Sequence, residues 1–406
     1  MLTTAIENKS SATDSAWKVF LLFLRLGFTS FGGPVAHLAY FREEFVTRRN
    51  WLSERSYIDV VALCQFLPGP ASSQVGIALG MTRSGFAGAI AAWVGFTLPS
   101  ALMLVLFAMS LNVWGAAIPS GALHGLKVVA VAVVAQAVWG MARNLCTDRA
   151  RVTIAALSAC VVLLLPSTFG QLGVLVISAI VGTLLFKQDP QTMHEPLPIA
   201  VSRRAGVVLL GLFFALLAGL PLLLRVWPSQ WLALVNAFFR AGSLVFGGGH
   251  VMLPLLQAAV VPNHWVSNET FLAGYGMTQA VPGPLTTFAA FLGASMQQPP
   301  TGWAGALICL VAIFTPSFLL IFGALPFWEI LRRSAHTQAA LAGVNASVVG
   351  LLLAALYAPV WTSAVLKPID FGMVVLALVA LISWKLPPWL VVLGCGAMGW
   401  WLGILF

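Results

Sequence analysis

The sequence predicts an all-helical, polytopic membrane protein, on the evidence of an apolar composition and a repeated pair of glycine–proline landmarks. Of the 406 residues, 60% are hydrophobic and only 8% are charged, and the mean hydropathy is +0.94. A soluble domain of this composition would expose hydrocarbon to water almost everywhere. Most of the long apolar runs approach the ~20 residues that a helix needs to cross hydrocarbon. These runs are Gly88–Met109, Leu123–Val138, Val152–Leu165, Gly206–Leu224, Ala304–Phe322, Val348–Leu356 and Phe371–Ile382.

The landmarks are a Phe-Gly-Gly turn and, about 35 residues later, a Gln-x-x-Pro-Gly-Pro break. The first copy comprises Phe31, Gly32, Gly33, Gln65, Pro68, Gly69 and Pro70, and the second comprises Phe246, Gly247, Gly248, Gln279, Pro282, Gly283 and Pro284. The same register pairs Arg25 with Arg240, Pro99 with Pro316 and Gly125 with Gly343. Because both copies lie within apolar sequence, the recurrence predicts two homologous membrane-embedded repeats.

The lysines and arginines change sides between the two repeats. In the first repeat, cations border the landmarks at Arg42, Arg48, Arg49, Arg55 and Arg83. The equivalent stretches of the second repeat, 262–270 and 297–302, contain neither lysine nor arginine. Since cation-rich short loops face the cytoplasm, the two repeats are predicted to lie antiparallel.

The predicted organisation has about 13 hydrophobic segments, with six in each repeat and one linker helix, and re-entrant hairpins are the alternative to some full crossings. We expect a cytoplasmic tail at 1–15, a first repeat at 16–187, a cytoplasmic connector at 188–204, a linker helix at 205–230 and a second repeat at 231–406. This arrangement places the N-terminus in the cytoplasm and the C-terminus in the periplasm. The sequence leaves open whether the chain forms a homo-oligomer.

The Pro-Gly-Pro breaks predict an anion site near the middle of the membrane. A break at this depth leaves backbone groups that hydrocarbon cannot satisfy, so it must be buried in protein or line an aqueous cavity. After each break the helix restarts with paired hydroxyls, Ser72 and Ser73 in one repeat and Thr286 and Thr287 in the other. Free amides, a positive dipole end and hydroxyl donors together favour an anion. The alternative is that the glycines only allow helices to pack closely.

Charged residues within the apolar segments are few. Arg25 and Arg240 each precede their Phe-Gly-Gly turn by six residues and could lend positive potential to the anion, or could snorkel or pair structurally. His37, His250 and Asp59 are the candidates for proton coupling. Each also has a structural reading, the histidines as hydrogen-bonded polar residues and Asp59 as an interfacial helix-start residue.

Other classes of function lack a matching motif in the sequence. The five cysteines show no metal-ligand spacing, and no phosphate-binding lysine loop, nucleophile elbow or paired metal-ligand helix is present. We therefore predict no enzyme activity, no cofactor and no metal site. The net charge of +9 resides in short loops beside apolar segments, which argues for topology signals rather than nucleic-acid binding.

The landmarks, together with Pro34, Gly80 and the Gly249-His250 pair, resemble those of the chromate ion transporter family in its long, two-domain form. The resemblance spans nearly the whole chain. It implies efflux of chromate across the bacterial inner membrane, conferring chromate resistance, with sulfate as the competing mimic. The residues alone indicate an anion transporter, and the alternatives are a permease for sulfate or another oxyanion, and a non-transporting membrane scaffold subunit.

Overall fold

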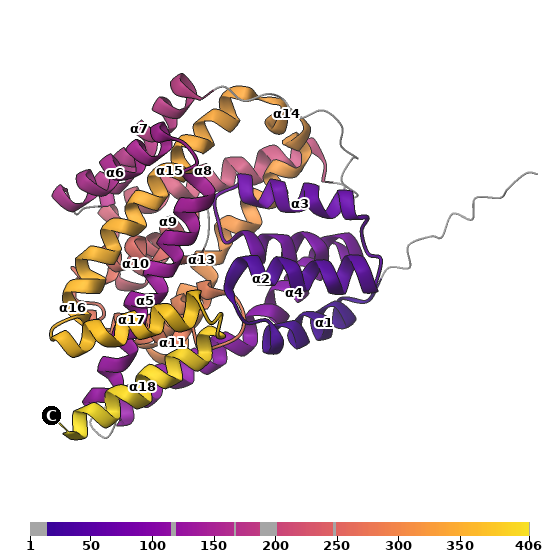
Figure 1. Ribbon diagram of the computed structural model, residues 1–406. Coiled ribbons are helices and arrows are strands. Elements are labelled where there is room, and N and C mark those ends of the chain that lie inside the picture. Colours follow the sequence, from indigo (N-terminus) through magenta and orange to yellow (C-terminus); the bar gives the residue numbers. More distant parts are fainter. Residues whose placement is uncertain (1–13, 115–118, 166–167, 187–200, 247–248, 406) are drawn as a thin grey trace, which may run out of the picture.

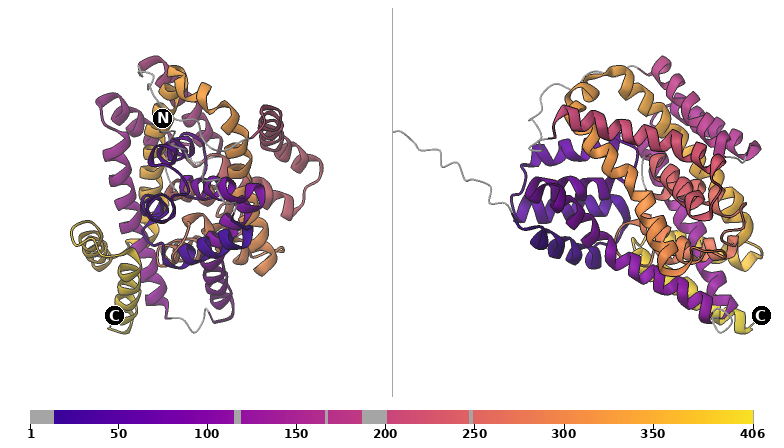
Figure 2. Two further views of the ribbon diagram at one scale, coloured as in Figure 1. Left: turned by 90° about the vertical axis from the view of Figure 1, so that its right-hand side faces the viewer. Right: turned by 180° about the vertical axis from the view of Figure 1, so that it is seen from behind.

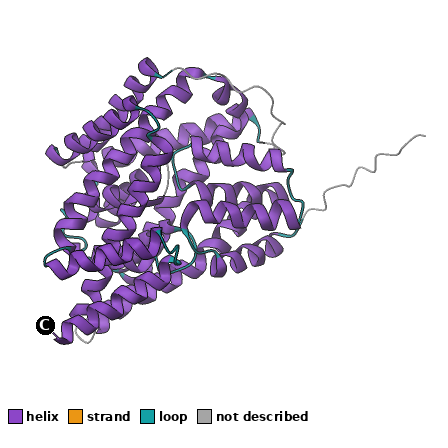
Figure 3. Cartoon of the chain, in the orientation of Figure 1, coloured by secondary structure: helices purple, strands orange, loops and turns teal. Residues whose placement is uncertain are grey.

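The computed structural model describes residues 14–114, 119–165, 168–186, 201–246 and 249–405, and these residues are helical almost throughout (Figure 3). No strand is assigned within these ranges, so the predicted all-helical class is confirmed there. Gly247 and Gly248 of the second Phe-Gly-Gly turn lie outside the described residues.

The chain begins with a helical hairpin. Helix α1 (Ala16–Thr29) starts at Ser15, whose hydroxyl accepts a hydrogen bond from the Lys18 amide. Helix α2 (Gly33–Phe41) and its extension η1 (Arg42–Arg48) fold back along α1, because the Phe23 ring lies 5.5 Å from that of Phe41 and 4.8 Å from that of Phe45. The reversal occurs at Gly32 and Gly33, which have positive φ angles of 103° and 78°. Glycine adopts this left-handed backbone without the steric cost of a Cβ atom.

A second hairpin follows, with the first Pro-Gly-Pro sequence at its turn. Its arms are α3 (Glu54–Phe66) and the first part of α4 (Ala71–Trp114), which is interrupted by non-helical angles at Ser84 and Gly85. Arg83, just before that interruption, forms an ion pair with Asp14 at 3.2 Å and lies 5.1 Å from the Trp51 ring. The first part of α4 therefore ends beside the start of α1, and α1 to α4 form one stack (Figure 1).

The remaining helices follow α4 in two groups, separated by α8. The first half ends with α5 (Ser120–Leu145), α6 (Arg149–Leu164) and α7 (Thr168–Leu185), and α8 (Arg203–Val226) leads to the second half. The second half contains α9 (Gln230–Ser243), η2 (Gly249–Val251), α10 (Met252–Val260), α11 (Asn268–Thr278), η3 (Leu285–Thr287), α12 (Phe288–Ala294) and α13 (Gly302–Ala324). It continues with η4 (Leu325–Phe327), α14 (Trp328–Arg333), α15 (Ala335–Ala355), η5 (Leu356–Trp361), α16 (Thr362–Ala364), α17 (Pro368–Ile382) and α18 (Pro388–Leu405).

The two halves interlock through their long helices. Helix α5 of the first half packs against α17 and α18 of the second, and α15 of the second half packs against α6 and α7 of the first. A Cβ atom at Gly125 would lie 2.1 Å from the Cys395 carbonyl oxygen, and one at Gly343 would lie 2.0 Å from that of Ser178. These helices thus meet backbone to backbone at the two glycines that the repeat register pairs. Figure 2 shows α1 to α3 on one side of the molecule and the C-terminal helix α18 at another corner.

Several helices have the length and composition of membrane spans. Within the described ranges, five helical stretches are long and apolar enough to cross a membrane, and five apolar helices of 10–17 residues accompany them. The long stretches are Ala71–Leu111, Ser120–Leu145, Arg203–Val226, Gly302–Phe327 and Ala335–Ala364. The length and composition of these helices are thus those of a multi-pass membrane protein. The count of about 13 segments stays a prediction.

Candidate functional site

Each Pro-Gly-Pro break is hydrogen-bonded to the Phe-Gly-Gly turn of the other half. The Gly69 amide donates to the Val245 carbonyl at 2.6 Å, and the Gly283 amide donates to the Ser30 carbonyl at 2.9 Å. Ser30 and Val245 each directly precede a Phe-Gly-Gly turn. Because proline has no amide hydrogen, the glycine supplies the only backbone donor within each Pro-Gly-Pro sequence. The four landmarks therefore meet in the structure as two crossed pairs.

The crossed pairs also explain why glycine occupies both positions. Gly69 and Gly283 have positive φ angles of 128° and 98°. A Cβ atom at Gly69 would lie 3.1 Å from the Ser317 hydroxyl, and one at Gly283 would lie 2.8 Å from the Ser100 hydroxyl. Both the backbone conformation and the close approach of the other half exclude a larger residue without rearrangement.

A cavity of about 570 Å³ opens beside one of these crossed pairs. We call it the signature cavity, because its walls include residues of the landmarks from both halves. The first half contributes Phe31, Gly32 and Gly33, and the second contributes His250, Gln279 and Gly283. Residues far apart in the sequence are therefore brought together, as the repeat pattern predicts for a site between the halves.

Gln279 is the most informative residue of the signature cavity. Its side chain is 9% exposed, and its Nε2 atom is buried with no hydrogen-bond partner among the described residues. A buried, unsatisfied amide costs roughly 1–3 kcal/mol, so such a group usually has a role. An oxygen of an anionic ligand in the cavity would accept this hydrogen bond once the Gln279 side chain turns toward the cavity, because Nε2 itself is buried.

Two polar residues of the cavity, Gln136 and Lys385, were not identified from the sequence, whereas His250 was. His250 Nδ1 lies 2.8 Å from the Tyr275 hydroxyl, and Gln136 of α5 adds a side-chain amide to the lining. Lys385, in the connection between α17 and α18, is the one lysine or arginine among the described lining residues. The signal for Gln136 was its position as a lone amide in the apolar run Leu123–Val138.

Several predicted site residues lie outside the walls of the signature cavity. Arg25 is exposed on α1, Arg240 and Phe246 are half-buried, and Gln65 is exposed at the end of α3. The hydroxyl residues Ser72, Ser73, Thr286 and Thr287 are buried, as are Gly69, Pro70, Pro282 and Pro284, whereas Pro68 is half-buried. The Thr287 hydroxyl donates to the Pro284 carbonyl at 2.7 Å, inside the second break. Their contribution to anion binding stays a prediction.

The candidates for proton coupling occupy different surroundings. His37 is buried, with Nδ1 3.4 Å from the Ser72 hydroxyl and its ring edge-on to Phe96 at 5.1 Å. Asp59 is buried in α3, and neither residue lines the signature cavity. Of the three candidates, His250 alone is among the described lining residues.

Comparison with known proteins identifies the family. The family model described as chromate transporter matches twice, over residues 17–183 and 232–400. A chromate transport protein of Pseudomonas aeruginosa is 27% identical over an alignment that covers 94% of this chain and 91% of the relative. A chromate transport protein of Cupriavidus metallidurans is 25% identical, with 87% and 85% covered.

The similarity also extends to a relative that is not bacterial and whose name gives no substrate. An uncharacterized transporter of Methanocaldococcus jannaschii is 27% identical over 84% of this chain and 83% of the relative. No solved structure matches the chain. Since the family model covers most of both halves, the chain belongs to the chromate transporter family and carries two copies of the family's domain.

Proposed function

We propose that the chain exports chromate across the bacterial inner membrane and thereby confers chromate resistance. The observation that carries this proposal is the unpartnered Gln279 amide in a cavity built from the landmarks of both halves. Support for chromate comes from relatives that are named chromate transport proteins and cover most of the chain. Sulfate, a similar tetrahedral dianion, is the expected competitor.

The polar groups of the signature cavity suit a dianion that must bind and leave. Gln279 and Gln136 offer uncharged amide donors, and Lys385 supplies one positive charge. A site with several fixed cations would bind a dianion strongly and slow its release. Transport, however, requires binding that is weak enough to reverse. Amide donors and one cation are therefore consistent with a carrier.

Membrane potential is sufficient to drive export. Moving one charge through 100 mV is worth roughly 2.3 kcal/mol, so expelling a dianion from a negative-inside cell gains about 4.6 kcal/mol. Uptake of the same dianion would need compensating cations. Proton antiport through His37, His250 or Asp59 is compatible with the proposal but is not required by the energetics.

The proposal includes an inverted arrangement of the two halves, with the N-terminus cytoplasmic and the C-terminus periplasmic. The ion pair of Asp14 with Arg83 supports an arrangement in which the first-half hairpins begin and end at the same end of the molecule. A 3.4 Å contact joins Lys127, near the start of α5, to Glu269, at the start of the second-half hairpin α11–α12. Because α4 continues beyond Arg83 before α5 begins, these contacts favour hairpins that open at opposite ends.

Equivalent positions should therefore be labelled from opposite sides of the membrane. Arg55 and Glu269 are exposed residues at the starts of α3 and α11. In a variant without the five native cysteines, we expect Arg55→Cys to react with a membrane-impermeant thiol reagent only in everted vesicles. Glu269→Cys should react only in intact cells whose outer membrane has been permeabilised. Labelling of both positions from one side would contradict the inverted arrangement.

Transport itself is tested with everted vesicles that contain the protein and are energised to an inside-positive potential. We expect radiolabelled chromate to accumulate, the accumulation to collapse with an ionophore that removes the potential, and excess sulfate to compete. Accumulation equal to that of empty vesicles would contradict the exporter and favour a scaffold subunit. Uptake by whole cells that rises on expression would instead favour an oxyanion permease.

Lys385 should contribute to substrate affinity. Replacement by glutamine removes the positive charge from an exposed position, where an ion pair is worth roughly 0.2–1 kcal/mol. We therefore expect the half-saturating chromate concentration to rise about 1.4- to fivefold, measured from initial rates in everted vesicles. Arg225→Gln, an exposed cation of α8 outside the cavity, is the matched control and should leave this concentration unchanged. Equal values for both variants would remove Lys385 from the site.

A further inference from the structure

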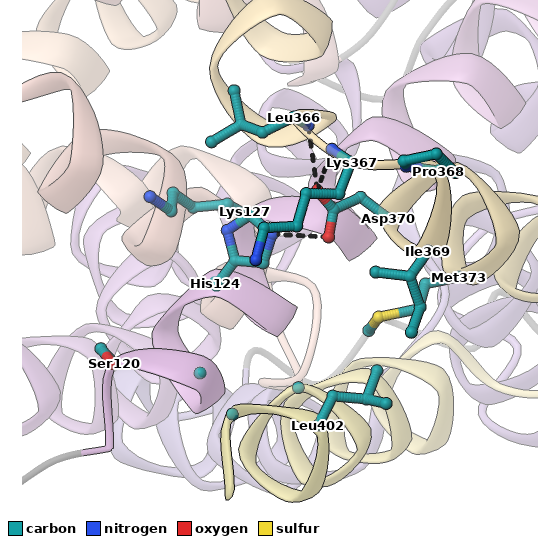
Figure 4. Close-up of a pocket in the computed structure, with 13 residues that line it drawn as sticks. Ser120, His124, Lys127, Leu366, Lys367, Pro368, Ile369, Asp370, Met373 and Leu402 are labelled. Atoms are coloured by element: carbon teal, nitrogen blue, oxygen red, sulfur yellow. Dashed lines mark hydrogen bonds and ion pairs between the residues drawn. The ribbon is translucent and has the colours of Figure 1, made fainter. Parts of the chain in front are cut away.

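A larger cavity of about 680 Å³ lies at the N-terminal end of α5 and is separate from the signature cavity. Its walls come from α5, α17 and α18 (Figure 4). On α5, Ser120, His124 and Lys127 line this larger cavity, whereas Gln136 and Gly140 line the signature cavity. At 3.6 residues per turn, the two sets lie roughly 180° apart around the helix. The two cavities therefore face different parts of the molecule, and we call the larger one the α5–α17 cavity.

The acidic group of the α5–α17 cavity already has three hydrogen-bonding partners within the protein. Asp370 lies 2.8 Å from His124 Nε2 and accepts hydrogen bonds of 2.9 Å from the Leu366 and Lys367 amides. Figure 4 shows these three interactions converging on one carboxylate. Most of the hydrogen-bonding capacity of this carboxylate is therefore used within the protein, so it is poorly suited to bind a cation.

Two lysines but one carboxylate are among the residues that line the same space. Lys367 and Lys127 both line the α5–α17 cavity, and Lys367 extends beside the His124 ring in Figure 4. The Lys127 side chain is only 13% exposed and contacts Glu269 at 3.4 Å, but the Glu269 side chain is 83% exposed. An ion pair with one partner in water is weak, so most of the Lys127 charge is available to another anion.

One helix start adds to this positive potential. Helix α5 begins at Ser120, which lines the α5–α17 cavity, whereas the start of α17 is capped by the Asp370 carboxylate. The N-terminus of a helix carries a partial positive charge and amide groups without partners inside the helix. The two lysine side chains and the start of α5 therefore favour an anionic group at this place.

The remaining walls are apolar, and exposed tryptophans lie beside them. Met373 and Leu402 line the α5–α17 cavity, and Gly399 and Gly403 form its side on α18. Trp400 and Trp401, between these glycines, are 53% and 61% exposed. Exposed tryptophans are enriched at membrane–water interfaces. An anion attached to apolar chains would match both the charged and the apolar parts of the walls.

We propose that the α5–α17 cavity binds the phosphate group of an anionic phospholipid. Lys367 and Lys127 interact with the phosphate, the start of α5 adds its dipole, and the acyl chains lie along Met373, Leu402 and the outer surface of α18. A free tetrahedral oxyanion shares the phosphate chemistry but has no apolar part. The site is independent of chromate export, because it lies apart from the signature cavity.

The test uses the purified full-length protein in detergent, with binding of phosphatidylglycerol measured by native mass spectrometry and by the shift in unfolding temperature. We expect phosphatidylglycerol to bind and to stabilise the protein more than phosphatidylcholine does. The double variant Lys127→Gln/Lys367→Gln should bind phosphatidylglycerol at least tenfold more weakly. Lys127→Arg/Lys367→Arg should retain binding, and Arg225→Gln, which removes a cation elsewhere, should behave as the parent protein.

Three results would overturn the proposal. One is equal binding of the two lipids by the parent protein, and another is unchanged phosphatidylglycerol affinity in the double glutamine variant. The third is that the parent protein binds inorganic sulfate without preferring the anionic lipid, and that sulfate binding is lost in the double glutamine variant but kept in Arg225→Gln. That result would assign the cavity to a free oxyanion. The charge-preserving arginine variant reports whether the altered side chains still allow folding. Because no transport is measured, failure of chromate export leaves this test unaffected.

Discussion

Replacement of Gln279 by leucine is expected to reduce chromate transport about ten- to a hundredfold while leaving the protein folded. A hydrogen bond to a charged group is worth roughly 1.5–3 kcal/mol, and each 1.4 kcal/mol corresponds to a factor of ten. Leucine resembles glutamine in volume and carries no amide, so it also removes the buried Nε2 donor that lacks a described partner. The free energy of unfolding should therefore stay the same or rise while transport falls.

The measurements are initial rates in everted vesicles and the unfolding temperature of the purified protein. Gln297→Leu is the matched control, because Gln297 is an exposed glutamine of the second half that does not line the signature cavity. It should keep the transport rate of the parent protein. Full transport by Gln279→Leu would show that the unpartnered amide has no part in binding the anion. A fall in transport that accompanies a fall in stability would point to a structural role instead.

Replacement of Gly343 by alanine is expected to destabilise the protein by about 1–3 kcal/mol, the usual cost of overpacking a close contact. The new Cβ atom would lie 2.0 Å from the Ser178 carbonyl oxygen and 2.9 Å from the Gly182 Cα atom. Both are backbone atoms, so α15 and α7 must separate to admit the methyl group. The unfolding temperature of the purified protein measures the effect.

Gly372→Ala provides the control for this prediction. Gly372 lies in α17, and a Cβ atom there meets nothing within 4 Å. Alanine is favoured over glycine in a helix by roughly 0.8–1 kcal/mol, so this variant should be as stable as the parent protein or slightly more stable. If Gly343→Ala matched Gly372→Ala in stability, the close contact between the two halves would not be a source of stability.

The sequence was sufficient for those features that local patterns determine. Composition predicts the all-helical class, and the positive φ angles at Gly32, Gly33 and Gly69 lie where the landmarks predict interruptions. The family that the landmarks resemble is the family to which the chain belongs. These features depend on neighbouring residues or on a repeat that can be read along the chain.

Features that depend on contacts across the fold were not predictable in the same way. The pattern pairs Gly69 with Gly283 as equivalents, but their hydrogen-bond partners are Val245 and Ser30, each in the opposite half. Lys385 lies more than a hundred residues after Gln279 and carries no motif, so nothing in the sequence connects the two. The orientation of Arg25 is also a property of packing, since an arginine in an apolar helix can face inward or outward.

The exchange of packing partners between the halves has a consequence for how the chain is made. Helix α5 is synthesised early, but residues that pack against it arrive last: His124 and its partner Asp370 are 246 positions apart. Domains usually fold in order of synthesis, and long-range contacts form slowly because the intervening chain must first be closed into a loop. In this protein neither half is complete until α17 and α18 emerge. Until then, the glycine-lined face of α5 is open to other membrane helices. A truncated chain would therefore fail during biogenesis, before the fold is complete.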